Sequence, residues 1–139
     1  MLLVLAIVFV LIQLVPYGRA HDNPPVTREP DWDSPRTAEL AKRACGDCHS
    51  NETTWPWYSK VAPFSWLMQN HVDEGREHFN FSEMNERQRK ADEAAEELDK
   101  GEMPPWAYLL AHPEAKLTNV EKRILIQGLR DTFGDRRDA

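Results

Sequence analysis

The stretch that decides the fold of this chain is Cys45-Gly46-Asp47-Cys48-His49. It contains both cysteines of the 139-residue sequence. Two residues at this spacing lie on one side of a helical turn, with Cβ atoms about 5–6 Å apart. The histidine follows directly. The motif therefore predicts that two thiols and one imidazole serve the same bound group.

A C-x-x-C-H pattern is typical of covalent haem attachment, because each thiol can form a thioether with a vinyl group of the porphyrin. Cys45 and Cys48 are the predicted attachment residues of one haem c, and His49 is its predicted proximal ligand. A disulfide and a mixed zinc site stay open. Further zinc ligands would come from His71, His78 and His112. A thioredoxin-like dithiol would need a βαβ pattern, which the sequence lacks.

Residues 2–15, LLVLAIVFVLIQLV, are almost wholly apolar, which indicates an export segment. The run is shorter than the roughly 20 residues of a full membrane span. Gly18 and Ala20 are small residues that fit a cleavage site after Ala20. Residues 1–18 are thus predicted to be a signal anchor or a cleaved signal peptide, with the anchor favoured. The rest of the chain is placed at the periplasmic side of the inner membrane, anchored or secreted.

The remaining chain divides by composition. Residues 19–34 are polar and proline-rich and predict an extended linker, in which His21 is expected to be solvated. Residues 35–134 form the predicted haem-binding domain, and residues 135–139 a disordered tail. The net charge of -6 argues against nucleic acid as a partner. It permits contact with a basic redox partner protein.

Helix signals place four helices in the domain and predict an all-α fold. Ser34-Pro35 starts a helix that leads into the cysteines. A second begins at Ala62-Pro63, and a third is expected over residues 83–100, with Ser82 as N-cap and Gly101 after its end. A T-x-x-E capping box at residues 118–121 starts the last helix. On the second helix, a core stripe is expected from Phe64, Leu67, Met68, His71 and Val72.

Aromatic residues and one methionine supply further candidate haem contacts. Trp55, Trp57 and Tyr58 lie within four residues of a loop, which suits a loop folded over a flat apolar ligand. Met103 precedes two prolines that would hold its thioether in place, so it is the predicted distal iron ligand, with His71 second.

Three further residues are candidates for contact with the haem propionates. Tyr108 or Trp106 is expected to hydrogen-bond a propionate. Arg76 is expected to pair with a propionate or a carboxylate, or to face solvent.

Several motifs in order resemble the haem-binding domain family of bacterial exported proteins. They are C-x-x-C-H-S, W-P-W-Y at 55–58, P-x-S-W at 63–66, Gly75-Arg76, N-F-S-E at 80–83, M-P-P-x-x-Y at 103–108 and H-P-E-A-x-L at 112–117. One small departure is His71, which precedes Val72 where the family has aspartate. The resemblance covers roughly residues 35 to 132. It implies haem binding and indicates no particular pathway.

Together these features predict a small cytochrome c-like helical domain around one covalently bound haem, preceded by an N-terminal hydrophobic helix. The predicted function is mono-haem electron transfer in the periplasm, so the protein is expected to be an electron carrier rather than an enzyme. The alternatives are a haem-based sensor or a peroxidase-like enzyme with an open sixth iron position, or an accessory haem subunit of a larger redox complex.

Overall fold

The computed structural model describes residues 1–134 of the chain. Within them the regular structure is helical, and the only β pairing is an isolated bridge between Arg28 and Glu83. The predicted all-α class is confirmed. The tail predicted at residues 135–139 lies outside the described residues.

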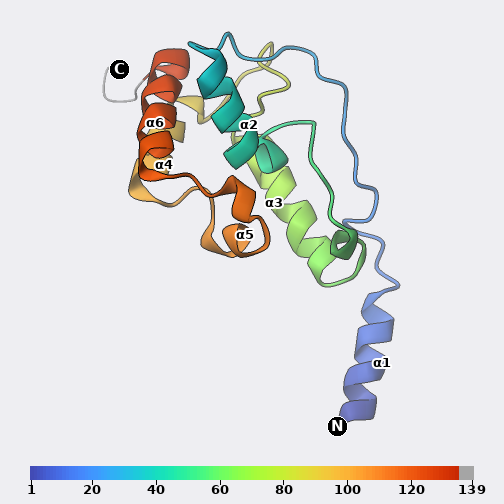
Figure 1. Cartoon of the computed structure of the whole chain (residues 1–139). Coiled ribbons are helices and arrows are strands. Elements are labelled where there is room, and N and C mark those ends of the chain that lie inside the picture. The colour runs from blue at the N-terminus through green and yellow to red at the C-terminus, as the bar shows by residue number, and fades with distance from the viewer. Residues whose placement is uncertain (135–139) are drawn as a thin grey trace.

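Six α-helices and three short 3-10 helices follow one another along residues 1–134. The α-helices are α1 (Leu2–Ile12), α2 (Pro35–His49), α3 (Phe64–His78), α4 (Ala94–Lys100), α5 (Trp106–Ala111) and α6 (Asn119–Phe133). The 3-10 helices are η1 (Trp57–Lys60), η2 (Ala91–Glu93) and η3 (Pro113–Ala115). In Figure 1, α2, α3, α4 and α6 make up the body of the domain, whereas α1 projects away from it.

Helices α2 and α6 begin at the residues where the capping signals of the sequence predict. At α2, the Ser34 hydroxyl accepts a hydrogen bond from the Thr37 N–H (3.2 Å), and Pro35 occupies the first turn. At α6, Thr118 and Glu121 form the full capping box, in which each side chain accepts from the other residue's backbone N–H. Both caps satisfy amide groups that lack a partner inside the helix.

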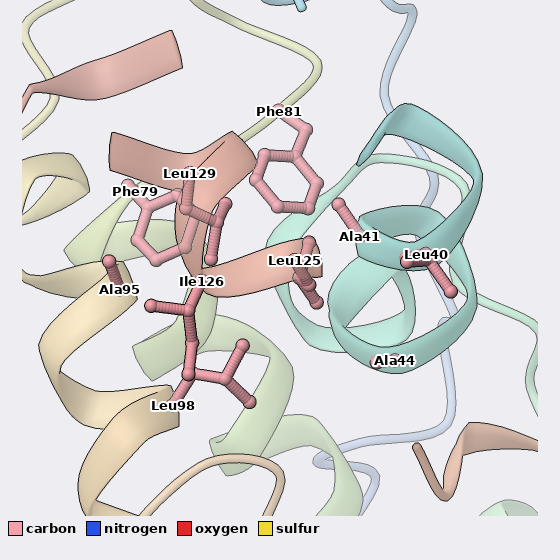
Figure 2. Close-up of a cluster of buried hydrophobic side chains, with 10 residues drawn as sticks. All are labelled: Leu40, Ala41, Ala44, Phe79, Phe81, Ala95, Leu98, Leu125, Ile126 and Leu129. Atoms are coloured by element: carbon pink, nitrogen blue, oxygen red, sulfur yellow. The ribbon is translucent and has the colours of Figure 1, made fainter. Parts of the chain in front are cut away.

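The core lies between α2, α4, α6 and the segment after α3 (Figure 2). Leu40 and Leu125 are completely buried and stand on facing helices. The other members are Ala41, Ala44, Phe79, Phe81, Ala95, Leu98, Ile126 and Leu129. Burial of an aliphatic side chain of this size contributes about 1.5–3 kcal/mol. This cluster therefore fixes the helix that carries the cysteines.

A glycine sets the distance between α2 and α6. A Cβ built on Gly128 would overlap the Thr37 side chain, so only glycine permits this approach. The predicted packing of the last helix on the first is confirmed at Leu125 and Leu129, which are buried. Ile124, expected in the same stripe, is 40% exposed.

The helix predicted over residues 83–100 is wrong in its first half, because only Ala91–Lys100 is helical. Backbone amides of residues 83–90 form hydrogen bonds with distant parts of the chain. Met84 N–H donates to the Arg28 carbonyl (3.0 Å), and Lys90 N–H donates to the His78 carbonyl (3.0 Å). The Ser82 hydroxyl accepts from Asn51 N–H instead of capping a helix. The end of the helix is as predicted, since Gly101 has the left-handed φ of 80°.

The core stripe predicted on α3 is also partly wrong. Val72 is buried, but Phe64 and Leu67 are 55% and 52% exposed. The buried face of α3 instead carries Ser65, Val72 and Gly75. Small residues on this face let α3 lie close to its neighbours, so the large apolar side chains point elsewhere.

The N-terminal segment consists of α1 and an extended stretch leading to α2. Among residues 1–134, no helix combines the length and the apolar character needed to cross a membrane. The expectation that His21 is solvated is wrong. Its ring stacks on Trp55 at a centroid distance of 4.5 Å, and its Nε2 lies 3.1 Å from the Ser59 carbonyl oxygen.

Candidate haem attachment site

The two predicted attachment cysteines lie on the last turns of α2. Both thiols are free in the structure. Burial raises the pKa of Cys45 to about 12 and that of Cys48 to about 11, and the neighbouring Asp47 carboxylate adds to the second shift. Reactive redox cysteines have lowered pKa values instead. The pair therefore lacks the lowered thiol pKa that is typical of dithiol exchange.

His49 is the last residue of α2, and its imidazole is only 8% exposed. Its Nδ1 lies 3.1 Å from the Phe79 carbonyl oxygen, and its ring stacks on the Phe79 ring at 4.2 Å. Burial lowers the pKa of His49, against the opposing effect of the Phe79 and Gly75 carbonyls. The ring is thus neutral at physiological pH. A carbonyl can only accept, so Nδ1 carries the proton and the lone pair remains on Nε2.

The backbone around His49 is held by the loop after α3. Phe81 N–H donates to the His49 carbonyl (2.7 Å), and Asn51 N–H donates to the Ser82 hydroxyl (2.9 Å). The Asn80 side-chain amide donates to Asn51 Oδ1 (2.8 Å), while its own Oδ1 accepts from Ser82 N–H (2.9 Å). Asn51, Asn80 and Ser82 are all buried. This polar network fixes the direction in which the chain leaves the cysteine motif.

Gly75 brings α3 against the same turn. A Cβ built at Gly75 would overlap the Cys48 carbonyl oxygen and would lie 3.0 Å from the Cys48 Cβ. Because α3 passes this closely, its C-terminal end delivers the Phe79 carbonyl to His49. Gly75 therefore helps to position the predicted iron ligand.

Asp47, between the two cysteines, joins the motif to α5. Its Oδ2 accepts a hydrogen bond from the Tyr108 hydroxyl (2.7 Å), and its Oδ1 accepts from Thr54 N–H (2.9 Å). Partial burial and the Asp47 carboxylate raise the pKa of Tyr108 well above its ordinary value. Tyr108 thus stays protonated and keeps donating.

A second aromatic link continues from Tyr108. Its ring stacks on His112 at 4.2 Å, and His112 Nε2 lies 3.3 Å from the Tyr58 hydroxyl. The Tyr58 ring in turn meets Phe64 edge-on at 6.3 Å. The structure therefore gathers Tyr58 and Tyr108, both predicted from sequence, on the side of the cysteine motif that faces α5 and η1.

Comparison with known protein families identifies the family of this chain. The model of the family described as haem-binding domain matches residues 7–131. The chain belongs to this haem-binding domain family. The resemblance noted from the sequence motifs is confirmed at the level of the family. No curated protein and no solved structure was found to match the chain.

The residues present fit the group that the haem-binding domain implies. Two free thiols stand one helical turn apart, and the adjacent imidazole is neutral with Nδ1 engaged. A ligating histidine normally donates its other ring N–H to a carbonyl or carboxylate, which fixes its tautomer, and the Phe79 carbonyl serves here. In contrast, no group of three or more His, Cys, Asp or Glu side chains within residues 1–134 is arranged to hold a metal ion. The zinc alternative gains no support.

Other predicted site residues of the haem-binding domain lie around this centre. Trp55 packs on His21, whereas Trp57 is 80% exposed and meets Tyr58 edge-on at 5.9 Å. Met103 follows α4 and is 38% exposed. His71 is half-buried on α3. The assignment of the distal position to Met103, with His71 second, stays a prediction.

Arg76 has a role that the sequence reasoning missed. Its guanidinium donates to the Ser50 carbonyl (2.8 Å), the Thr53 hydroxyl (3.1 Å) and the Asn23 side chain (3.0 Å). It also donates to the Asp22 carbonyl (3.0 Å). No carboxylate oxygen is among these acceptors, and the side chain is half-buried rather than solvent-facing. Contact of Arg76 with a propionate stays a prediction. The Gly75-Arg76 motif was the available signal, since one residue permits helix contact and the next ties down the loop after His49.

Proposed function

We propose that this protein carries one covalently attached haem c and transfers single electrons at the periplasmic side of the inner membrane. Cys45 and Cys48 would form the thioethers, and His49 would bind the iron through Nε2. The observation that carries the proposal is the His49 environment, in which the Phe79 carbonyl holds the Nδ1 proton of a neutral, buried imidazole. Membership in the haem-binding domain family supports it.

Bound haem would supply reversible one-electron chemistry, with a potential set by its axial ligands and surroundings. The chain's own contribution is to keep the ligand geometry the same in both oxidation states. The network of Asn51, Asn80 and Ser82 fixes the backbone beside His49. Asp47 and Tyr108 hold the motif to α5. A site held by both sets of contacts reorganises little when the charge on the iron changes. Small reorganisation suits electron transfer.

The test is production of the chain in a host that matures c-type haem. We expect one haem per chain that survives denaturation and acid–acetone extraction, measured by intact mass and absorption. Cys45→Ala and Cys48→Ala should each leave one thioether at most, and His49→Ala should shift the spin state. His78→Ala is the matched control and should retain the haem and its spin state. A colourless product with free thiols would refute the proposal.

Occupancy of the sixth iron position distinguishes an electron carrier from a haem-based sensor or a peroxidase-like enzyme. Methionine ligation gives ferric haem a weak long-wavelength band, because the band depends on axial ligand identity. We expect Met103→Ala to remove it, while Met68→Ala and Met84→Ala keep it. A band that survives in Met103→Ala would show that the distal assignment is wrong. A wild-type protein without the band that binds carbon monoxide would favour the open-site alternative.

A further inference from the structure

Helix α1 has an apolar surface on every side, and none of its residues is buried by the rest of the chain. Leu3 and Leu5, which lie on nearly opposite faces of the helix, are 73% and 60% exposed. Soluble proteins rarely leave an apolar surface of this extent uncovered, and where they do it marks a contact with another molecule or with lipid. A helix that is apolar all round fits a lipid environment better than a groove on a protein, which would cover one face.

The end of α1 is joined to the domain by a two-point contact. The Gln13 side-chain amide donates to the Ala62 carbonyl (3.0 Å), and its Oε1 accepts from Ala62 N–H (3.0 Å). Ala62 is completely buried. Arg19 also donates to Gln13 Oε1 (3.2 Å). Two hydrogen bonds between the planar Gln13 amide and Ala62 fix the orientation of the end of α1 relative to the domain. A single bond would leave it free to rotate.

The chain then packs along α3. Gly18 is buried with a φ of 76°, and a Cβ at this position would overlap the Ser65 carbonyl oxygen. The Tyr17 hydroxyl donates to the Asp73 carboxylate (3.1 Å). Position 18 requires glycine for two reasons: the positive φ and the close approach to Ser65. Residues 13–18 are therefore an integral part of the folded domain.

Contacts continue on the other side of Ala20, where the sequence suggests a cleavage site. His21 stacks on Trp55, and the Asn23 side chain both accepts from Arg76 and donates to the Thr53 carbonyl (2.9 Å). Cleavage after Ala20 would remove Gln13, leave the amide and carbonyl of Ala62 without their partner, and uncover Ser65. The family match also begins at residue 7, inside α1.

We propose that residues 1–20 stay in the mature protein and that α1 inserts into a phospholipid bilayer, with the Gln13–Ala62 joint holding the haem domain in one fixed orientation on the membrane. The proposal rests on the proposed export of the chain. It requires α1 to enter the apolar layer, not to cross it. In Figure 1, α1 leaves the domain at the end where α3 begins.

The corner of the domain beside this joint carries suitable side chains for a membrane surface. Trp57 is 80% exposed and Lys60 is exposed, both on η1, which ends two residues before Ala62. Tryptophan and lysine are enriched at the headgroup level of membrane proteins. The η1 corner therefore faces the bilayer when α1 is inserted.

The first experiment isolates membranes from cells that express the full chain with haem maturation. We expect the protein to stay in the pellet after an alkaline carbonate wash, and its intact mass to include residues 1–20. A mass that begins at His21 would overturn the proposal. Mass and fractionation are read equally well on colourless protein, so failure of haem attachment is distinguishable from failure of this inference.

The second experiment tests the fixed orientation in liposomes. Trypsin cleavage after Arg19 should be slow in the wild type and several-fold faster in Gly18→Ala or Gln13→Leu, because both variants release the joint. Linear dichroism of the haem band in aligned bilayers should be present in the wild type and lost in these variants. Gly101→Ala is the matched control: Gly101 has the same positive φ, but its Cβ would meet no atom within 4 Å. Wild-type behaviour in both joint variants would overturn the fixed orientation.

Discussion

Replacing Tyr108 by phenylalanine removes one hydroxyl and with it the hydrogen bond that joins α5 to Asp47 in the cysteine motif. The bond is short, 2.7 Å, and partly buried, and its acceptor is a carboxylate. Hydrogen bonds to charged groups contribute about 1.5–3 kcal/mol to stability. Because Tyr108 is only half-buried, we place the loss at the lower end, about 1.5 kcal/mol.

The chain has two other tyrosines, and each provides a matched control. The Tyr58 hydroxyl lies 3.3 Å from His112 Nε2, a longer contact than that of Tyr108 and one without a carboxylate acceptor, so Tyr58→Phe should cost about 0.5 kcal/mol. The Tyr17 hydroxyl donates to Asp73 at an exposed position, so Tyr17→Phe should cost less than about 0.5 kcal/mol. The expected order of cost is therefore Tyr108, then Tyr58, then Tyr17.

The assay is urea unfolding of the haem-loaded proteins, followed by far-ultraviolet circular dichroism. Midpoints are compared at a common slope, since a single hydroxyl does not change the surface exposed on unfolding. If Tyr108→Phe is no less stable than Tyr17→Phe, the contact between α5 and the cysteine motif does not stabilise the fold. The assigned role of Tyr108 would then be refuted.

Three further substitutions test the packing and the caps. Gly128→Ala places a methyl group on Thr37 and should lower the free energy of unfolding by about 1–3 kcal/mol in urea. Gly46→Ala is its control: the nearest atom is 3.9 Å away, so stability should not fall, and equal losses would contradict the packing argument. Gly75→Ala should reduce haem per chain by pushing α3 off Cys48, and unchanged loading would contradict that role. The Glu121 pKa is lowered to about 2, chiefly by Thr118 N–H and then by Arg43. The ionised Glu121 carboxylate therefore stabilises the fold fully above its ordinary pKa of 4.5. This stabilisation is lost as the pH falls toward about 2. Glu121→Gln should thus be less stable than the wild type at pH 6 but not at pH 2, and parallel pH profiles of the urea midpoint would contradict this.

The parts of the fold that sequence predicts are those set by neighbouring residues. Ser34-Pro35, the Thr118–Glu121 capping box and Gly101 all act within one turn of a helix, and each lies where expected. Residues 83–90 were mispredicted because their amides bond to distant partners such as the Arg28 carbonyl. A charged, helix-favouring composition gives no sign of such partners. Tertiary contacts override local preference in this segment.

In the candidate site, too, some residues could be predicted from local sequence and others depend on tertiary contacts. Cys45, Cys48 and His49 follow from spacing alone, because their chemistry needs those side chains at that interval. The groups that orient His49 could not be predicted, since the Phe79 carbonyl is a backbone atom that every residue possesses. Arg76 was assigned charged partners because its side chain is charged. All four of its acceptors are neutral: two backbone carbonyls, the Thr53 hydroxyl and the Asn23 side-chain amide oxygen.

Orientation of His49 by a backbone carbonyl has a consequence for how the site tolerates change. No side-chain substitution can remove that acceptor, so only residues that place the backbone can disturb it. Gly75 sets the approach of α3, and Asn80 and Ser82 anchor the loop that follows Phe79. Sensitivity to substitution should therefore concentrate at the small and amide residues that place this part of the backbone. The aromatic residues nearest the cysteine motif contribute surface and hydrogen bonds, which their neighbours can partly replace.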